Sequence, residues 1–198
     1  EKARSFAAAP AGLSRGFAAK AKLFVLNGDG VEGFAADGSP AGTLLTLARP
    51  AGASWWYCAV GIEPTTGDLL VGSYYPDSKV YRFEASGAPF TRDGWPRGGH
   101  ASALPALGDT AWIVELGGVA RPLPRVQGRG AAGPALGGLG TMYASGVARD
   151  ASGAYWIASS QGLVRFDAKG RPTGERLGGI EGVRSLAVAP VSFVAENL

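Results

Sequence analysis

The first candidate for chemistry is His100, because a histidine side chain titrates near neutral pH and can act as a general base. It is the single histidine of the 198 residues and stands in the segment Arg97-Gly-Gly-His100, just before a predicted strand. No catalytic motif surrounds it, so we favour a histidine in a surface loop over a base. We therefore assign no catalytic residue, and His100 stays the weak candidate.

Metal binding has little support in the sequence. Asn27, Asp29 and Glu32 superficially resemble a calcium loop, but a third ligand at the expected spacing and the distal bidentate glutamate are missing. A tight turn between two strands explains these residues. Cys58 is the single cysteine, so neither an internal disulfide nor a cysteine-based zinc site can form, and its apolar surroundings predict a small buried side chain. We expect no metal and no cofactor.

Ligand binding is better supported, by aromatic residues in predicted loops. Tyr74 and Tyr75 lie in a turn that is three residues longer than the equivalent turn at residues 159–161, and two tyrosines at a loop tip could stack on a sugar or a peptide. Trp95 lies on a connection between units. We predict that Tyr74, Tyr75, Trp95 and His100 contribute to a ligand site; an ordinary surface hairpin is the alternative for the tyrosines.

Basic residues are scattered along the chain. The net charge is +3, from 19 basic and 16 acidic residues, and no dense run is present, so we expect no nucleic-acid partner. Arg82, Arg121 and Arg165 occupy equivalent places in the predicted units. They could form a ring that attracts anions, or they could be solvated strand residues.

The elements that must position these residues are short strands. The sequence has 32 glycines and 13 prolines, interleaved with apolar runs of four to six residues, which is typical of many strands joined by tight turns. The spacing Phe-x-x-x-Gly-x-Pro occurs at residues 34–40, 83–89 and 166–172. The phenylalanine ends a strand, the glycine permits positive φ in the turn, and the proline begins the next segment. A degenerate copy at residues 112–121 has Pro122 in place of the phenylalanine.

Each unit reads as four strands in about 40 to 45 residues, which is the length of a propeller blade. Residues 17–19 are predicted to be the first inner strand, after an extension at residues 1–16. The predicted blades are residues 17–54, 55–98, 99–142 and 143–182, and residues 183–195 begin a fifth. Residues 196–198 match the start of an engineered protease tag, and the glycine-rich residues 128–140 read as a long connection. A β-helix and a sandwich are the alternatives.

The repeat resembles known propeller families. Residues 150–167 resemble the blade repeat of bacterial two-component regulators, and residues 63–87 resemble the NHL, gluconolactonase and streptogramin-lyase group. This resemblance implies an all-β propeller, which serves as a binding platform, a sensor or, less often, an enzyme. The streptogramin-lyase group uses a histidine base. In a gluconolactonase-like metal site, Glu63, Asp150 and Asn27 would be possible contributors.

These patterns favour a non-enzymatic propeller module that binds a protein, a small molecule or a glycan. One alternative is an enzyme of the lyase or lactonase type. The other is a structural unit that assembles through an incomplete ring into a homo-oligomer, because four blades leave a bare apolar face. For the short ring we favour a fragment of a longer propeller or such an assembling unit, and a small ring closed by the C-terminal strands is the alternative. No apolar run is long enough to span a bilayer. We expect a bacterial protein located outside the cell or in the periplasm.

Overall fold

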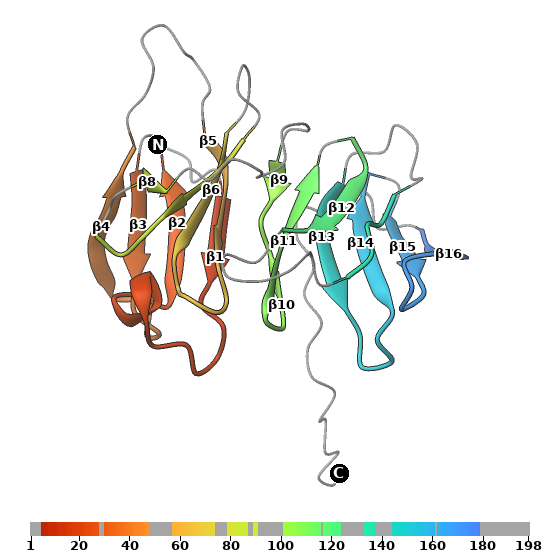
Figure 1. Ribbon diagram of the computed structural model, residues 1–198, viewed down its shortest axis with the longest axis horizontal. Helices are drawn as coiled ribbons and strands as arrows, with labels where there is room; N and C mark the ends of the chain where they lie inside the picture. Colours follow the sequence, from red (N-terminus) through yellow and green to blue (C-terminus); the bar gives the residue numbers. More distant parts are fainter. Residues whose placement is uncertain are drawn as a thin grey trace, which may run out of the picture.

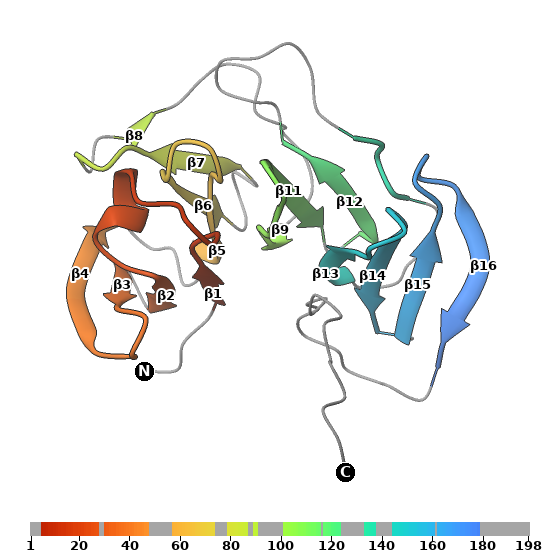
Figure 2. The same ribbon diagram turned by 90° about the horizontal axis from the view of Figure 1, so that it is seen from below.

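The structure is a computed structural model, and it describes residues 5–27, 30–47, 57–73, 79–86, 89–90, 101–115, 117–123, 133–137, 144–160 and 162–178. These residues form four antiparallel sheets and one short 3-10 helix. The sheets stand side by side around a common centre, like the blades of a fan (Figures 1 and 2). The predicted all-β class is therefore confirmed.

Each sheet is a consecutive stretch of the chain. The first contains β1 (Ser5–Ala8), β2 (Leu23–Asn27), β3 (Gly30–Phe34) and β4 (Pro40–Thr46). The second contains β5 (Tyr57–Ile62), β6 (Leu69–Ser73), β7 (Val80–Phe83) and β8 (Pro89–Phe90). The third contains β9 (Ala101–Ala103), β10 (Ala106–Leu107), β11 (Thr110–Glu115) and β12 (Val119–Pro122). The fourth contains β13 (Ala144–Arg149), β14 (Tyr155–Ser159), β15 (Gly162–Phe166) and β16 (Pro172–Leu177).

The innermost strands line the centre of the fan. β1 contacts β5, β5 contacts β9, and β9 contacts β13. Gly61 of β5 makes a parallel bridge to Leu104, and a Cβ at Gly61 would lie 2.2 Å from the Leu104 carbonyl oxygen, so only glycine allows this approach. Neighbouring sheets bury each other's faces, which is the architecture of a β-propeller. Within the described part of the chain, the four blades form an open fan and not a closed ring (Figure 2).

The three predicted phenylalanine corners are confirmed. Phe34, Phe83 and Phe166 each end the third strand of a blade. Each is paired across the sheet with the first residue of the preceding strand: Leu23, Leu69 and Tyr155, respectively. The register therefore repeats from blade to blade, as the spacing predicted.

The third blade differs from the prediction by one residue. Pro122 is paired with Trp112, and Leu123 follows it with its backbone N–H donating to the Ala111 carbonyl oxygen at 2.8 Å. In the fourth blade Phe166 pairs with Tyr155, and Ala111 is the residue of the third blade that corresponds to Tyr155. Leu123 therefore takes the place of Phe166. The prediction that Pro122 takes the place of the phenylalanine was wrong. The β11–β12 turn shifts the pairing by one residue, so that Trp112 pairs with Pro122, whereas Trp156 pairs with Arg165.

The first blade begins earlier than expected. Residues 17–19 are not a strand; they belong to the 3-10 helix η1 (Gly16–Ala19). The inner strand is β1, which lies within the segment that was assigned to an extension. The long β1–β2 connection lets η1 fold over the blade edge, where Phe17 is fully buried in the core shared with the second blade. The predicted boundaries between blades, the fifth unit and the tag lie outside the described residues.

η1 is anchored to the second blade by backbone contact. The Phe17 N–H donates to the Gly67 carbonyl oxygen at 2.7 Å. Gly67 has a φ of 76°, and a Cβ there would lie 2.0 Å from the Arg15 carbonyl oxygen. A glycine is therefore required at this turn between β5 and β6.

Hydrogen bonds also join the inner strands. Cys58 and Ser102 each sit at an irregularity in strand pairing, and both side chains reach the next blade. The Cys58 Sγ donates to the Ala101 carbonyl oxygen at 3.0 Å, and the Ser102 Oγ donates to the Ala144 carbonyl oxygen at 2.7 Å. Cys58 is thus half-buried and hydrogen-bonded, and burial raises the pKa of its thiol to about 12.

Among the described residues, no helix has the length and apolar character needed to cross a bilayer.

Candidate functional site

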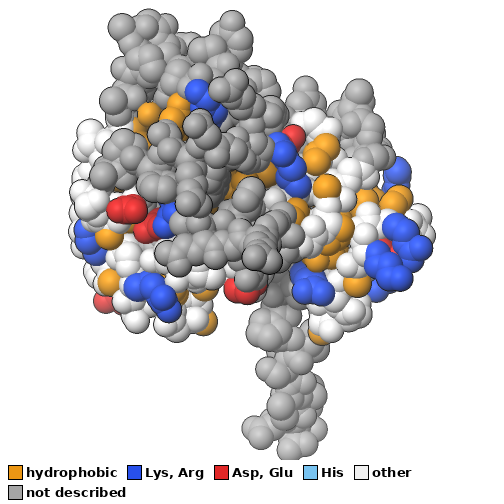
Figure 3. All heavy atoms as spheres, viewed as in Figure 1, with side chains coloured by type: hydrophobic (Ala, Val, Ile, Leu, Met, Phe, Trp, Pro, Cys, Tyr) orange, Lys and Arg blue, Asp and Glu red, His pale blue; other side chains and the backbone are white. Residues whose placement is uncertain are grey.

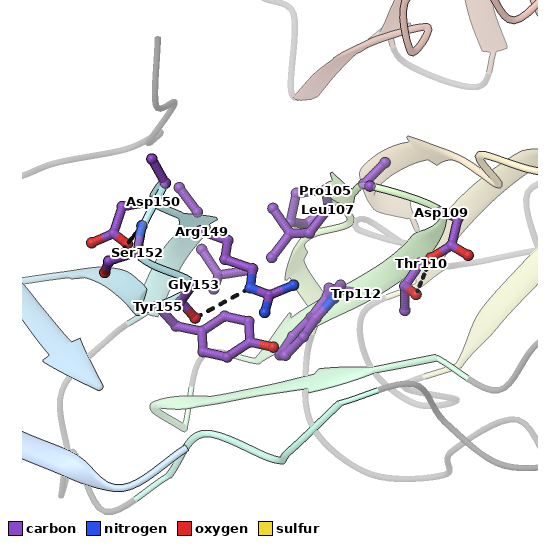
Figure 4. A pocket seen from close by; sticks show the side chains of 15 residues that line it. Pro105, Leu107, Asp109, Thr110, Trp112, Arg149, Asp150, Ser152, Gly153 and Tyr155 are labelled. Atoms are coloured by element: carbon purple, nitrogen blue, oxygen red, sulfur yellow. Dashed lines mark hydrogen bonds between the residues drawn. The ribbon is translucent and has the colours of Figure 1, made fainter. Parts of the chain in front are cut away.

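A cavity of about 960 Å³ opens between the third and fourth blades. One wall is the β10–β11 hairpin, which turns at Gly108 and Asp109. The other wall is the β13–β14 turn, which contains Asp150 and Ser152. Figure 4 shows the side chains of both walls around a shared hollow. Both turns lie at the lower end of their blades in Figure 1.

The base of the cavity is aromatic. Trp112 of the third blade packs against Tyr155 of the fourth, with ring centroids 5.3 Å apart and an angle of 44° between the planes. Both side chains are buried and belong to the core shared by these two blades. Packing therefore fixes the base, and Trp112 and Tyr155 both line the cavity.

Arg149 is the cation of this site. It is the last residue of β13, and its guanidinium carbon lies 5.3 Å from the centre of the Tyr155 ring. Its Nε donates to the Gly153 carbonyl oxygen at 3.2 Å. Figure 4 shows the guanidinium extending into the hollow above Tyr155 and Trp112. No carboxylate pairs with Arg149 in the described part of the chain, so its outer N–H groups can bind a carboxylate or a phosphate.

The position of Arg149 is unusual within the repeat. Arg149 pairs with Tyr155 across the sheet, just as Ile62 pairs with Leu69 in the second blade. Ile62 is buried, because η1 of the first blade covers that rim. The third blade has only a short hairpin turn at the corresponding place. A polar residue therefore replaces an apolar one where the inter-blade core is left open.

The carboxylates of the cavity have structural partners. The Asp150 carboxylate accepts hydrogen bonds from the Ser152 hydroxyl at 2.6 Å and from the Trp156 Nε1 at 3.0 Å. These bonds, the one from Ser152 first, lower the pKa of Asp150 to about 2. Asp109 accepts a hydrogen bond from the Thr110 hydroxyl at 3.1 Å. Asp150 thus holds its turn together, and its charge is paired with the Arg165 guanidinium at 3.8 Å.

The residues that a gluconolactonase-like metal site would draw on, Glu63, Asp150 and Asn27, do not converge. The Glu63 carboxylate accepts bonds from the backbone and hydroxyl groups of Thr65 and Thr66 in the β5–β6 turn. Asn27 ends β2, at the opposite rim from the turns of Glu63 and Asp150. Among the described residues, no three His, Cys, Asp or Glu side chains form a group that could hold a metal ion.

The three arginines for which a ring or solvated strand positions were the alternatives do not form a ring, and Arg82 is not solvated. Arg82 is buried between blades and forms an ion pair with Asp68, to which its Nε donates at 2.6 Å. Arg121 pairs with Glu115 and is one residue out of register, which turns it to the other face of its blade. The Arg165 Nη1 donates to Glu175 at 2.8 Å. Each charge is neutralised within its own blade.

The predicted ligand-binding residues, Tyr74, Tyr75, Trp95 and His100, lie outside the described residues. The strands next to them are described. β6 ends at Ser73 and β9 begins at Ala101, and both strand ends lie at the rim opposite the Arg149 cavity. Sequence reasoning missed Arg149, and the one signal for it was a charged residue at a position that is apolar in the second unit.

Comparisons with known proteins support the fold. No family model matches the chain, and no curated protein matches it in sequence. A solved structure of a protein of unknown function from Bacteroides caccae is 17% identical, with a TM-score of 0.53, over 92% of this chain and 64% of that one. The WD40 β-propeller domain of Doa1 is 13% identical, with a TM-score of 0.58, over 92% of this chain and 56% of that one. A catalytically inactive virginiamycin B lyase from Staphylococcus aureus with quinupristin is 11% identical, with a TM-score of 0.54, over 76% of this chain and 50% of that one.

These similarities establish the fold alone, because all the identities are low. The chain spans between 50% and 64% of the lengths of these three structures. The chain therefore has the fold of a β-propeller and corresponds to about half to two thirds of the propeller proteins that it resembles.

Proposed function

We propose that the protein is a non-enzymatic β-propeller module that binds a ligand or a protein partner through an anionic group. The observation that carries this proposal is Arg149, a cation in the open cavity between two blades, stacked on Tyr155. A guanidinium held over an aromatic ring has lost part of its freedom before binding, which lowers the entropic cost of gripping a carboxylate or a phosphate.

The cavity also selects its ligand by charge and shape. Asp109 and Asp150 stand on opposite walls and both have partners within the protein, so the lining residues of the cavity offer one cation, Arg149, between polar walls. The site therefore suits a single anionic group followed by a polar segment, as in the side chain or the end of a peptide.

The test is binding to an array of acidic and phosphorylated peptides, with Arg149→Ala as the variant. Loss of one charge-assisted bidentate contact should weaken binding by about tenfold or more. Arg176→Ala is the matched control, because Arg176 lies on the exposed outer strand β16 and its substitution removes the same charge at a distant place. If no peptide binds the parent chain, or if both variants bind equally, the proposal fails.

The lyase or lactonase reading remains the second candidate, supported by the similarity to virginiamycin B lyase in fold. Turnover of a streptogramin or a lactone by the parent chain, and its loss in His100→Ala, would establish this alternative. Tyr74, Tyr75 and Trp95 remain proposed ligand contacts. Deletion of the Tyr74-Tyr75 turn should then remove binding to a glycan or peptide array without affecting the Arg149 site.

A further inference from the structure

The face that each blade presents to the preceding blade has a repeated set of apolar positions. In the second blade, Leu69, Val71 and Phe83 pack against the first blade. In the fourth blade, the same register positions pack against the third blade. They are Tyr155, Ile157 and Phe166. All six side chains are at most 7% exposed.

The first blade has the same positions, but they are not covered. Leu23, Val25 and Phe34 occupy them, as the pairing of Leu23 with Phe34 shows. Leu23 is 37% exposed, and Val25 and Phe34 are half-buried. Phe6, which pairs with Val25 across the sheet, is 65% exposed. We call these four residues the Leu23 face.

The opposite end of the fan shows the complementary deficit. Trp156 of the fourth blade corresponds to Trp112 and Leu70, which are fully buried against the next blade. Trp156 itself is half-buried, with the Arg165 guanidinium 5.6 Å from its ring centre. The first and fourth blades form the two ends of the row of described blades (Figure 2).

We propose that a second copy of this chain covers the Leu23 face with its fourth blade. Two copies joined head to tail contain eight of the described blades, which is within the range of closed propellers. The same interface then forms twice and closes with two-fold symmetry, so no apolar face stays open.

Charged side chains are present at both ends. The Leu23 face contains Glu32 of β3, whose carboxylate accepts a bond from the Thr43 hydroxyl at 2.8 Å. The end of the fourth blade contains Arg165, which is paired with Glu175 and Asp150 of the same blade. Figure 3 shows basic side chains gathered over the outer strands of the fourth blade. Because Arg165 is already paired, the proposal rests on the matching apolar positions of the two ends and not on charge.

The contact between the third and fourth blades serves as a template for the new interface. There, Trp112 packs against Tyr155. Trp156 is equivalent to Trp112, and Leu23 is equivalent to Tyr155. The expected central contact is therefore between Trp156 of one copy and Leu23 of the other.

The first test is the mass of the purified chain in solution, measured by size-exclusion chromatography with light scattering. The parent should have twice its monomer mass of 20.2 kDa. Leu23→Glu should give a folded monomer, because it places a charge at the centre of the interface. Arg176→Glu is the matched control, because Arg176 is exposed on the outer strand β16 and pairs with Val164, which packs toward the third blade, so it lies on the opposite face from Trp156. This variant should stay dimeric.

A monomeric parent would overturn the proposal, and the face would then belong to another occupant, such as further blades of a longer chain. The arrangement is tested by mixing Leu23→Cys with Trp156→Cys and adding a short bismaleimide. Head-to-tail contact gives cross-linked dimers in the mixture and not in either variant alone, since the thiol of Cys58 has a pKa raised to about 12 by burial. Cross-linking of Leu23→Cys alone would show a head-to-head dimer and contradict the arrangement. None of these outcomes depends on the Arg149 cavity.

Discussion

At the scale of single residues, Asp150 links the wall of the cavity to the fold of the fourth blade. Its carboxylate accepts bonds from the Ser152 N–H and hydroxyl, from the Ala154 N–H and from the Trp156 indole. All these groups are donors, so they stabilise the ionised form. The turn that positions Arg149 therefore depends on a charged aspartate.

The first prediction concerns acid stability. The folded pKa of Asp150, about 2, is depressed, mainly by the bond from the Ser152 hydroxyl. The stabilisation is therefore complete above the unfolded pKa of about 3.9 and is lost as the pH falls through about 2. Asp150→Asn should lower the melting temperature at neutral pH and should reduce its further fall on acidification from about pH 5 to about pH 2.

Thermal unfolding followed by circular dichroism across this pH range is the measurement. Asp37→Asn is a suitable comparison, because Asp37 accepts the same kind of bond from Ser39 but in an exposed turn of the first blade. Parallel pH profiles for the parent and Asp150→Asn would contradict the role assigned to Asp150.

At the scale of elements, each blade is fixed by the apolar residue that ends its third strand. Phe83 and Phe166 are buried against the preceding blade, whereas Phe34 occupies the same place on the Leu23 face and is half-buried. The three residues are chemically identical and share one register, so they differ only in what covers them.

The second prediction follows from this difference. Phe166→Ala should lower the free energy of unfolding by about 3–5 kcal/mol, because it removes a buried ring and leaves a cavity. Phe34→Ala should cost only about 1 kcal/mol, since much of its ring already contacts water. Both are measured by urea unfolding, in the Leu23→Glu background so that the chain is monomeric. Equal losses would contradict the assignment of an uncovered first-blade face.

The elements also show which parts of the structure the sequence could predict. The glycine-proline corners predicted the strand ends at Phe34, Phe83 and Phe166, because turn chemistry is local. They misplaced Pro122, since a shift of one residue in strand pairing depends on contacts across the sheet. The strand predicted at residues 17–19 was wrong for a similar reason. Its apolar residues are buried, but in a 3-10 helix that covers the blade edge.

The candidate site was harder to predict than the fold. The cavity depends on which blade faces lack a covering element, and that is a property of neighbouring units. The charge of Arg149 was visible in the sequence, but its contact with Tyr155 follows only from the register of β13 and β14. The pairing register of these two strands could be read only from the folded structure.

At the scale of the whole molecule, stability is distributed over contacts between neighbouring blades, as in other repeat proteins. The inner strands are joined in series: the Ser5 Oγ accepts from the Val60 N–H at 3.1 Å, and Cys58 and Ser102 reach the following blades. The two end blades each have one neighbour among the described blades. A ring formed by two copies would give every blade two neighbours, and the gain would be largest for the first and fourth.

The third prediction is therefore that stability depends on protein concentration. If dimerisation covers the Leu23 face, a tenfold increase in concentration should add about 1.4 kcal/mol per mole of dimer to the free energy of unfolding. The urea midpoint should rise accordingly. In Leu23→Glu the midpoint should be independent of concentration, because no second copy is bound, whereas in Arg176→Glu it should still rise. A parent midpoint that stays constant over two decades of concentration would exclude a ring made by two copies, and the apolar end of the first blade would have to be covered in another way.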